Sequence, residues 1–220
     1  MLRTLGKIPT DVTVACSGGP DSMAILDFLM KGRKNVQVAY FNHGTPFGRH
    51  SAEWVHDYCS THKIKFLMRT IDRKKRGDES PEEFWRNERY RFLNEIDSHV
   101  ITGHHLDDVV EWWLFTSFHG NPRLIPSQNK NVIRPFLITA KSDIWDWIER
   151  KNVPYLTDPS NFDKKYARNR IRHEVVKEVL KINPGIRKTI KKKLIQHFDS
   201  PNYSLGESSN ASRIFSTDSA

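Results

Sequence analysis

The sequence has little cysteine and no long apolar run. Its 220 residues include two cysteines, Cys16 and Cys59, which do not form a Cys-x-x-Cys pair. We therefore expect neither a disulfide framework nor a cysteine-based zinc or iron–sulfur site. The low cysteine content also predicts that the protein resides in a reducing compartment. No stretch approaches eighteen apolar residues, which excludes a membrane-spanning helix on length. The first residues lack the apolar stretch of a signal peptide, so we expect a soluble, cytoplasmic protein.

The basic residues are unevenly distributed. The formal net charge is +9, from 35 basic and 26 acidic residues. The segment from Lys164 to Lys193 holds twelve lysines and arginines against two acids, which leaves the rest of the chain close to neutral. A concentrated basic segment beside a neutral domain is typical of proteins that bind polyanions such as nucleic acids. A solvated helix face is the plainer alternative, and charge alone does not decide between them.

Strand-like and helix-like segments alternate along the first two thirds of the chain. Short β-branched or apolar runs predict strands over 11–16, 36–41, 65–71 and 100–102. Apolar residues at helical spacing predict helices over 21–31, about 51–62, from 81 onward and over 106–118. This alternation predicts right-handed crossovers and parallel strands. The expected fold is α/β, a Rossmann-like parallel sheet with helices on both faces and a short C-terminal helical appendage.

The C-terminal third is expected to be mainly helical. Helices are predicted over 140–151 and 168–181, and a last helix follows the Pro184-Gly185 break to residue 198. We expect residues 1–139 to form the α/β domain and residues 140–198 to form a helical, basic extension that contacts RNA. Serine and asparagine enrichment predicts that residues 199–220 form a disordered tail.

A glycine-rich loop follows the first predicted strand, with the residues Ser17, Gly18, Gly19, Pro20, Asp21 and Ser22. Ligands of open parallel sheets bind beyond the carboxyl ends of the strands. The two glycines let backbone N–H groups approach phosphate oxygens, and the following helix adds the positive end of its dipole. The serine hydroxyls add donors, and the aspartate is suited to hold Mg²⁺ between phosphates. The loop is neither a Walker loop nor Gly-x-Gly-x-x-Gly. A simple glycine turn with a serine cap is the alternative.

This loop resembles the signature of the ATP-pyrophosphatase, or PP-loop, superfamily, whose members cleave ATP between the α and β phosphates. Three further stretches resemble one group within it, namely 41–44 (Phe-Asn-His-Gly), 103–111 (Gly-His-His-Leu-Asp-Asp-Val-Val-Glu), and 158–161 (Asp-Pro-Ser-Asn) with 166–173. In this order, over about four fifths of the chain, the motifs are similar to those of the tRNA(Ile)-lysidine synthetase family. The resemblance also implies a fold of the adenine nucleotide alpha hydrolase type, with ATP bound by residues 1–139.

The resemblance implies a ligase that forms a carbon–nitrogen bond. Such an enzyme attaches lysine to C2 of the wobble cytidine, position 34, of a tRNA with a CAU anticodon. It proceeds through an adenylated tRNA and releases AMP and pyrophosphate. The implied co-substrate is ATP with Mg²⁺, the second substrate is free lysine, and no membrane is involved. A homodimer would enlarge the RNA-binding surface, and the sequence leaves the oligomeric state open.

By motif position, the resemblance assigns catalytic roles to Asp21, Asp108, Glu111 and Arg170. It assigns ATP binding to the loop together with Asn42, His43 and Gly103. Asp108 and Glu111 would hold the amino groups of lysine, since carboxylates three apart share one face of a helix. A solvated acidic helix start is the alternative.

The resemblance and the charge pattern together assign tRNA binding to Arg168, Arg172, Lys188, Lys191 and Lys192. A zinc site at the adjacent histidines, His104 and His105, is disfavoured, because neighbouring side chains on a helix point about 100° apart.

The chain departs from the family pattern in two places. It ends soon after the basic helix, where members commonly carry further domains, and its 118–131 loop is divergent. Three rival functions remain. A tRNA 2-thiolation enzyme would need reactive cysteines, and an amidotransferase-coupled synthetase would have no use for the basic segment. A non-catalytic RNA-binding relic would have no need of an intact loop with Asp21.

Overall fold

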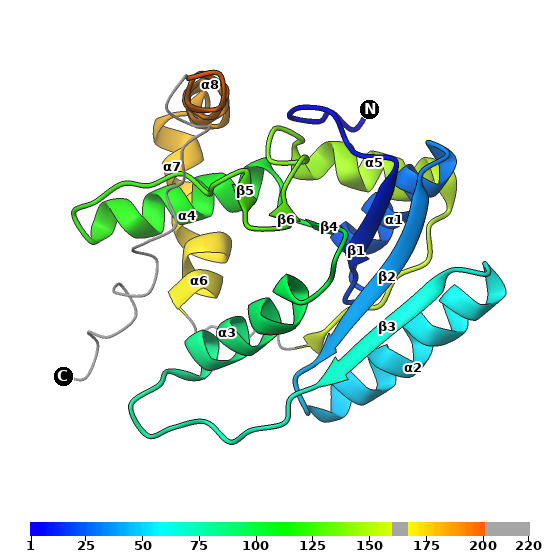
Figure 1. Ribbon diagram of the computed structural model, residues 1–220. Coiled ribbons are helices and arrows are strands. Elements are labelled where there is room, and N and C mark those ends of the chain that lie inside the picture. The colour runs from blue at the N-terminus through cyan, green and yellow to red at the C-terminus, as the bar shows by residue number, and fades with distance from the viewer. Residues whose placement is uncertain (160–166, 201–220) are drawn as a thin grey trace.

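The computed structural model of the chain describes residues 1–159 and 167–200. The described residues form a six-stranded sheet with helices packed around it (Figure 1). Its strands are β1 (Asp11–Ala15), β2 (Asn35–Asn42), β3 (Lys65–Thr70), β4 (His99–Thr102), β5 (Gln128–Asn129) and β6 (Val132–Ile133). The strand order is β3-β2-β1-β4-β6-β5. All neighbouring strands pair in parallel except β5 and β6, which are antiparallel. The expected parallel α/β sheet is therefore confirmed.

Helices connect these strands and follow them. They are α1 (Pro20–Lys31), α2 (Pro46–Thr61), α3 (Pro81–Asn94), α4 (Leu106–Phe118), α5 (Lys141–Lys151), α6 (Ala167–Arg170), a π-helical segment (Ile171–Val175), α7 (Val176–Ile182) and α8 (Ile186–Phe198). Three of them begin with a proline, whose fixed φ suits a first helical position. The Ser80 hydroxyl accepts a hydrogen bond from the Glu83 N–H at 3.2 Å and caps α3. None of the described helices is long and apolar enough to cross a membrane.

Alternating side chains of the strands cover the two faces of the sheet. On one face, Val14 of β1 and Val38 of β2 are fully buried against α1, α2 and α5. On the other face, Ala39 of β2 and Val100 of β4 pack with Phe92 of α3. Because successive residues of a strand point to opposite sides, these short apolar runs require cover on both faces. Helices on both faces of the sheet are thus confirmed.

A separate apolar cluster attaches the C-terminal helices to α4. Leu114 of α4 packs in it with Ile171 of the π-helical segment and with Ile190 and Leu194 of α8. Figure 1 shows α8 nearly end-on at the upper left, above α7 and α4. The buried positions of α8 recur every four residues, which leaves the intervening lysines Lys188, Lys192 and Lys193 exposed.

The structure differs from the sequence expectations at several element boundaries. Helix α2 begins at Pro46, before the expected start at Ser51, because the Thr45 hydroxyl caps it by accepting from the Gly48 N–H at 3.0 Å. The helix expected over 168–181 extends from Ala167 to Ile182 and contains a π-helical segment. The two-residue strands β5 and β6 were not predicted, since they are too short to show an alternating pattern.

Other expectations concern the C-terminal third. Residues 160–166, which include Ser160 and Asn161 of one motif, lie outside the described residues, as do 201–220 of the predicted tail. Helix α5 packs on α1 and contributes Ile144 and Ile148 to the core on that face of the sheet. The first helix after residue 140, α5, therefore packs as part of the α/β core. Their role as a tRNA-contacting extension stays a prediction.

We expect Ile190→Ala to lower the free energy of unfolding by about 2–5 kcal/mol, because it leaves a cavity between α8 and α4. Ile190 is 1 % exposed and lies at the centre of this contact. The measurement is equilibrium urea unfolding, with Lys193→Ala on the exposed side of the same helix as the control. Equal stabilities of the two variants would mean that α8 is not held on α4.

Candidate functional site

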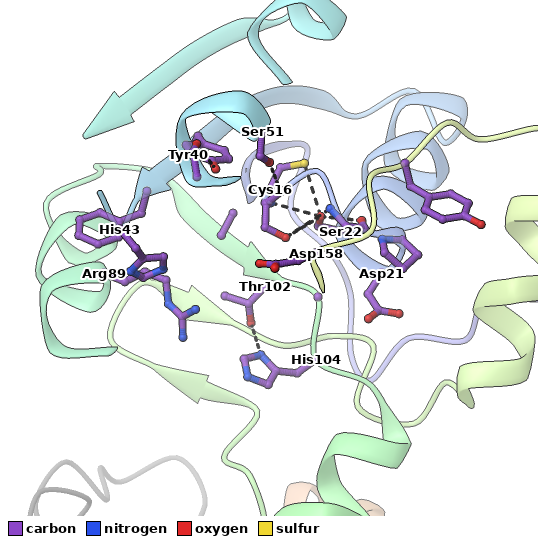
Figure 2. Close-up of a pocket in the computed structure, with 18 of the residues that line it drawn as sticks. Cys16, Asp21, Ser22, Tyr40, His43, Ser51, Arg89, Thr102, His104 and Asp158 are labelled. Atoms are coloured by element: carbon purple, nitrogen blue, oxygen red, sulfur yellow. Dashed lines mark hydrogen bonds between the residues drawn. The ribbon is translucent and has the colours of Figure 1, made fainter. Parts of the chain in front are cut away.

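A cavity of about 720 Å³ opens at the carboxyl ends of β1, β2 and β4. Its lining comes from the glycine-rich loop, the ends of the strands, helices α2 and α3, the starts of α4 and α5, the segment after α5, and the π-helical segment. Figure 2 shows Asp21, Ser22, His43, Thr102 and His104 around this cavity. Carboxyl ends of parallel strands are the expected ligand site of such a sheet. Residues from all four of the sequence motifs therefore come together in one place, the last motif through Asp158, Arg172 and His173.

The glycine-rich loop requires glycine at position 18. Gly18 has φ +80°, a left-handed conformation that side chains rarely adopt. A Cβ there would also lie 3.1 Å from both the Ser51 hydroxyl and a Val55 methyl. The Gly18 carbonyl accepts a hydrogen bond from the Leu156 N–H at 2.8 Å. This glycine therefore lets the loop turn tightly between α2 and the segment after α5.

Ser22 ties the loop to the first turn of α1. Its hydroxyl donates to the Gly19 carbonyl at 3.0 Å and accepts from the Ser17 N–H at 3.3 Å. Gly103 passes close to this turn, where a Cβ would lie 3.4 Å from the Ser22 nitrogen. The missing side chain leaves room beside the first N–H groups of α1. A helix start that is open in this way, with its positive dipole end, suits an anion such as phosphate.

Asn42 and His43 have different places in the site. Asn42 is 5 % exposed and its side-chain oxygen accepts from the Gly44 N–H at 2.8 Å, so it shapes the turn after β2. His43 lines the cavity, with its ring 5.0 Å from Phe41 and 5.9 Å from Trp85. Burial, together with the charge of Arg89, lowers the pKa of His43 to about 4. A neutral aromatic ring on this wall suits contact with a planar base.

Asp21 is paired with two cationic groups. Lys141 at the start of α5 donates from Nζ to the Asp21 carboxylate, and His105 Nε2 lies 3.7 Å from the same oxygen. Burial alone would raise the pKa of Asp21, but the His105 hydrogen bond and charge, with those of Lys141, lower it to about 2. Asp21 is therefore ionised throughout the physiological range.

His105 links the loop to α4. Its Nε2 also lies 3.4 Å from Asp108, whose carboxylate accepts from the His105 N–H at 2.9 Å. Although burial lowers the pKa of His105, the charges of Asp108 and Asp21 outweigh that effect and raise it. A raised pKa means that the imidazolium contributes stability below about 6.5 and that this contribution is lost as the pH rises through the folded value.

The carboxylates of Asp108 and Glu111 share a single partner. Arg172 donates from Nε to Glu111 at 2.9 Å and from Nη2 to Glu111 at 2.9 Å and to Asp108 at 3.2 Å. Burial raises the pKa of Glu111, and Arg172 offsets that only in part. The two acids thus form a pocket for a cation, as their spacing predicts, and Arg172 of this chain occupies it.

A third contact joins α8 to the same helix start. Arg187 donates from Nε to Asp107 at 2.8 Å, and the other oxygen of that carboxylate accepts from the Lys141 N–H at 2.9 Å. The expected site did not include Lys141, His105 or Arg187. The position of His105 inside the His-His motif was the one available signal, because the partners of Lys141 and Arg187 are 80 or more residues away.

The remaining basic candidates lie apart from the cavity or outside the description. Arg170 is exposed and is not among the residues that line the cavity. The side chain of Arg168 lies outside the described residues. Lys188 and Lys192 are exposed on α8, and Lys191 is half-buried there. Their assignment to tRNA stays a prediction. Among the described residues, no group of three or more His, Cys, Asp or Glu side chains is arranged to hold a metal ion.

We expect His105→Gln to raise the pKa of Asp21 from about 2 towards 3.8, because Asp21 loses the hydrogen bond and the positive charge of His105. An acid with a lowered folded pKa stabilises the protein above about pH 3.9, and this contribution is lost as the pH falls towards the folded value. Carboxyl ¹³C NMR at pH 3 should find Asp21 ionised in the parent and partly protonated in the variant. His62→Gln, at an exposed histidine, is the control. An unchanged Asp21 signal would remove His105 from the pairing.

Comparisons with known proteins agree with the loop and its setting. Residues 4–179 match the family model of the PP-loop domain. The chain is 32% identical over 195 residues to a tRNA(Ile)-lysidine synthase of Pseudothermotoga lettingae, covering 80% of this chain and 43% of that protein. For the same enzyme of Thermosipho africanus the identity is 30%, over 79% of this chain and 44% of that protein.

The chain spans less than half the length of these two curated relatives. Among solved structures, an NH3-dependent NAD synthetase from Campylobacter jejuni aligns with a TM-score of 0.47 and 15% identity, over 91% of this chain and 89% of that one. The family model covers most of the chain and includes both the glycine-rich loop and the acidic start of α4. The chain therefore belongs to the PP-loop domain family.

Proposed function

We propose that this chain is a tRNA(Ile)-lysidine synthetase that uses ATP to ligate lysine to C2 of the wobble cytidine in a tRNA with a CAU anticodon. The observation that carries the proposal is one cavity lined both by the open start of α1 and by Asp108 of the carboxylate pair on α4. The first suits the phosphates of ATP and the second a lysine ammonium. Curated relatives with this activity at about 30% identity support the assignment.

ATP would lie with its phosphates at the start of α1 and its base towards His43. The loop N–H groups and the Ser17 hydroxyl would donate to phosphate oxygens there, while the Ser22 hydroxyl keeps its bond to the Gly19 carbonyl and shapes the loop. Mg²⁺ bound between phosphates needs few protein ligands, and the ionised Asp21 fits that need. Bound there, Mg²⁺ would neutralise charge on the phosphate oxygens as pyrophosphate leaves.

The first step joins tRNA to AMP. The C2 carbonyl oxygen of cytidine attacks the α-phosphorus of ATP, the bond to the β-phosphate oxygen breaks, and pyrophosphate leaves with that electron pair. A ring carbonyl oxygen is a poor leaving group, whereas AMP is a good one, which is why the adenylate must form first. The donors at the start of α1 stabilise the charge that develops on pyrophosphate.

The second step joins lysine to the activated ring. The neutral ε-amine attacks C2, the bond from C2 to the adenylate oxygen breaks, and AMP leaves as lysidine forms. Asp108 and Glu111 would bind the ammonium of lysine, and the raised pKa of Glu111 suits it to accept the proton that the amine must lose. Lysine must first displace Arg172 from these carboxylates.

The RNA would reach the cavity along the basic helices. Lys188 and Lys192 are exposed on α8, and Arg187 of that helix is bonded to the acidic start of α4. An RNA backbone on these lysines would therefore run close to the site where the cytidine must bind. We include Lys191 and, by motif position, Arg168 in this surface.

Sulfur transfer is the weaker alternative. The two cysteines, Cys16 and Cys59, are 2 % and 0 % exposed. Burial raises the pKa of Cys16, and it raises the pKa of Cys59 to about 12. Because the thiolate is the reactive form, neither group is suited to carry sulfur to a substrate.

We expect the chain to incorporate ¹⁴C-lysine into a transcript with a CAU anticodon, in a reaction that requires ATP and magnesium. Asp21→Ala should lower the rate by about 100-fold or more, as expected for loss of a group that stabilises charge in the transition state. A transcript with a GAU anticodon is the matched RNA control.

A folded protein that binds tRNA but transfers no lysine would contradict the ligase assignment. ATP–pyrophosphate exchange without lysine transfer would indicate a different acceptor for the adenylate. Absence of both would favour a binding-only protein.

We expect Arg172→Ala to tighten the binding of free lysine by roughly three- to tenfold, since removal of an exposed ion pair frees about 1 kcal/mol. The same variant should transfer lysine no faster than the parent, because Arg172 lines the cavity in which the reaction would take place. Isothermal titration calorimetry without ATP or tRNA measures the affinity. Lys177→Ala, at an exposed residue of α7, is the control. Weaker lysine binding in Arg172→Ala would show that Arg172 helps to hold lysine and does not compete with it.

A further inference from the structure

The glycine-rich loop contains no lysine, yet a lysine from another helix contacts it. Lys141 is the first residue of α5, 120 residues beyond Asp21, and it lines the cavity. Its Nζ donates to the Asp21 carboxylate in the first turn of α1. A Walker loop carries its own lysine to contact the β and γ phosphates. Here the cation comes instead from a separate helix, beyond β6.

The backbone of Lys141 is held in place by α4. Its N–H donates to Asp107 at 2.9 Å, and the Leu106 N–H donates to the Thr139 carbonyl at 2.8 Å. The start of α5 is thus attached to the start of α4 by two bonds, which leaves the long side chain of Lys141 free to change partners. The side chain is 31 % exposed, and its ammonium lies 5.6 Å from the ring of Trp145.

The charges around the loop favour a second partner for Lys141. A phosphate at the start of α1 would lie beside the Asp21 carboxylate, and two anions repel unless a cation lies between them. The Lys141 ammonium is already in contact with that carboxylate and has three donors on a flexible stem. A small movement of the side chain would let it contact a phosphate oxygen and Asp21 together.

We propose that Lys141 is the phosphate-binding lysine of this site and contacts the pyrophosphate portion of ATP. In the proposed reaction it would hold the β and γ phosphates in the ground state and stabilise the negative charge on departing pyrophosphate. The inference rests on the proposed function only in that ATP is the nucleotide. It does not depend on the acceptor or on lysine.

The alternative is that Lys141 merely fastens α5 to α1. In that case its loss would disturb the whole cavity, and every nucleotide would bind less well. A phosphate-binding lysine affects only ligands that carry the β and γ phosphates. Comparison of AMP with an ATP analogue therefore separates the two roles.

The test is calorimetric titration of the full chain with α,β-methylene-ATP, with inorganic pyrophosphate and with AMP, each in the presence of magnesium. We expect Lys141→Ala to weaken the ATP analogue and pyrophosphate by roughly 10- to 100-fold, the usual effect of losing a charge-assisted hydrogen bond. The affinity of Lys141→Ala for AMP should stay within about twofold of the affinity of the parent protein for AMP. Lys141→Arg, which keeps the charge, should retain most of the affinity for the analogue.

Lys151→Ala is the matched control, because Lys151 ends the same helix and lies over Trp147 rather than at the cavity. Equal losses for AMP and the analogue in Lys141→Ala would overturn the proposal in favour of a fastening role. Unchanged affinity for all three ligands would overturn it as well. A parent protein that binds the analogue but makes no lysidine would refute the proposed function and leave this comparison intact.

Discussion

The site depends on the pairing of the acids of α1 and of the start of α4 with cations from later parts of the chain. The acids lie on α1 and at the start of α4, whereas their partners belong to α5, the π-helical segment and α8. The pairs are Asp21 with Lys141, Asp108 and Glu111 with Arg172, and Asp107 with Arg187. Four carboxylates this close would repel one another if left unpaired. The C-terminal helices are therefore part of the site, and the sheet and its first helices alone would leave it with uncompensated charge.

This pairing also defines how ligands can enter. A ligand that brings its own charge takes over a contact that a charged side chain of the chain already makes. Phosphate at α1 would share Lys141 with Asp21, and an ammonium at α4 would displace Arg172. Each ligand thus competes with a side chain that is already in position, which lowers its affinity but leaves the acids ionised and oriented beforehand.

Local patterns predicted the sheet and the loop, but not the long-range pairs. β-Branched runs identified β1 to β4, and the two glycines identified the turn where Gly18 has positive φ. The three-residue spacing of Asp108 and Glu111 placed both on one face. No such signal existed for Lys141 or Arg187, since their contacts result from the packing of α5 and α8 against elements about 80 to 120 residues away. The strands β5 and β6, of two residues each, have no period to detect.

The arginine motif shows how an apolar neighbour determines which charge enters the site. Ile171 is 7 % exposed and packs with α4, whereas Arg170 before it is exposed to solvent. Arg172 follows the buried residue and its guanidinium lies over Asp108 and Glu111. A π-helical turn, a form often found at functional sites, begins at this point. Since one residue turns a helix by about 100°, a shift of one position would remove Arg172 from the carboxylates. The sequence alone offers three arginines at alternate positions, and the burial of Ile171 selects the one that enters the site.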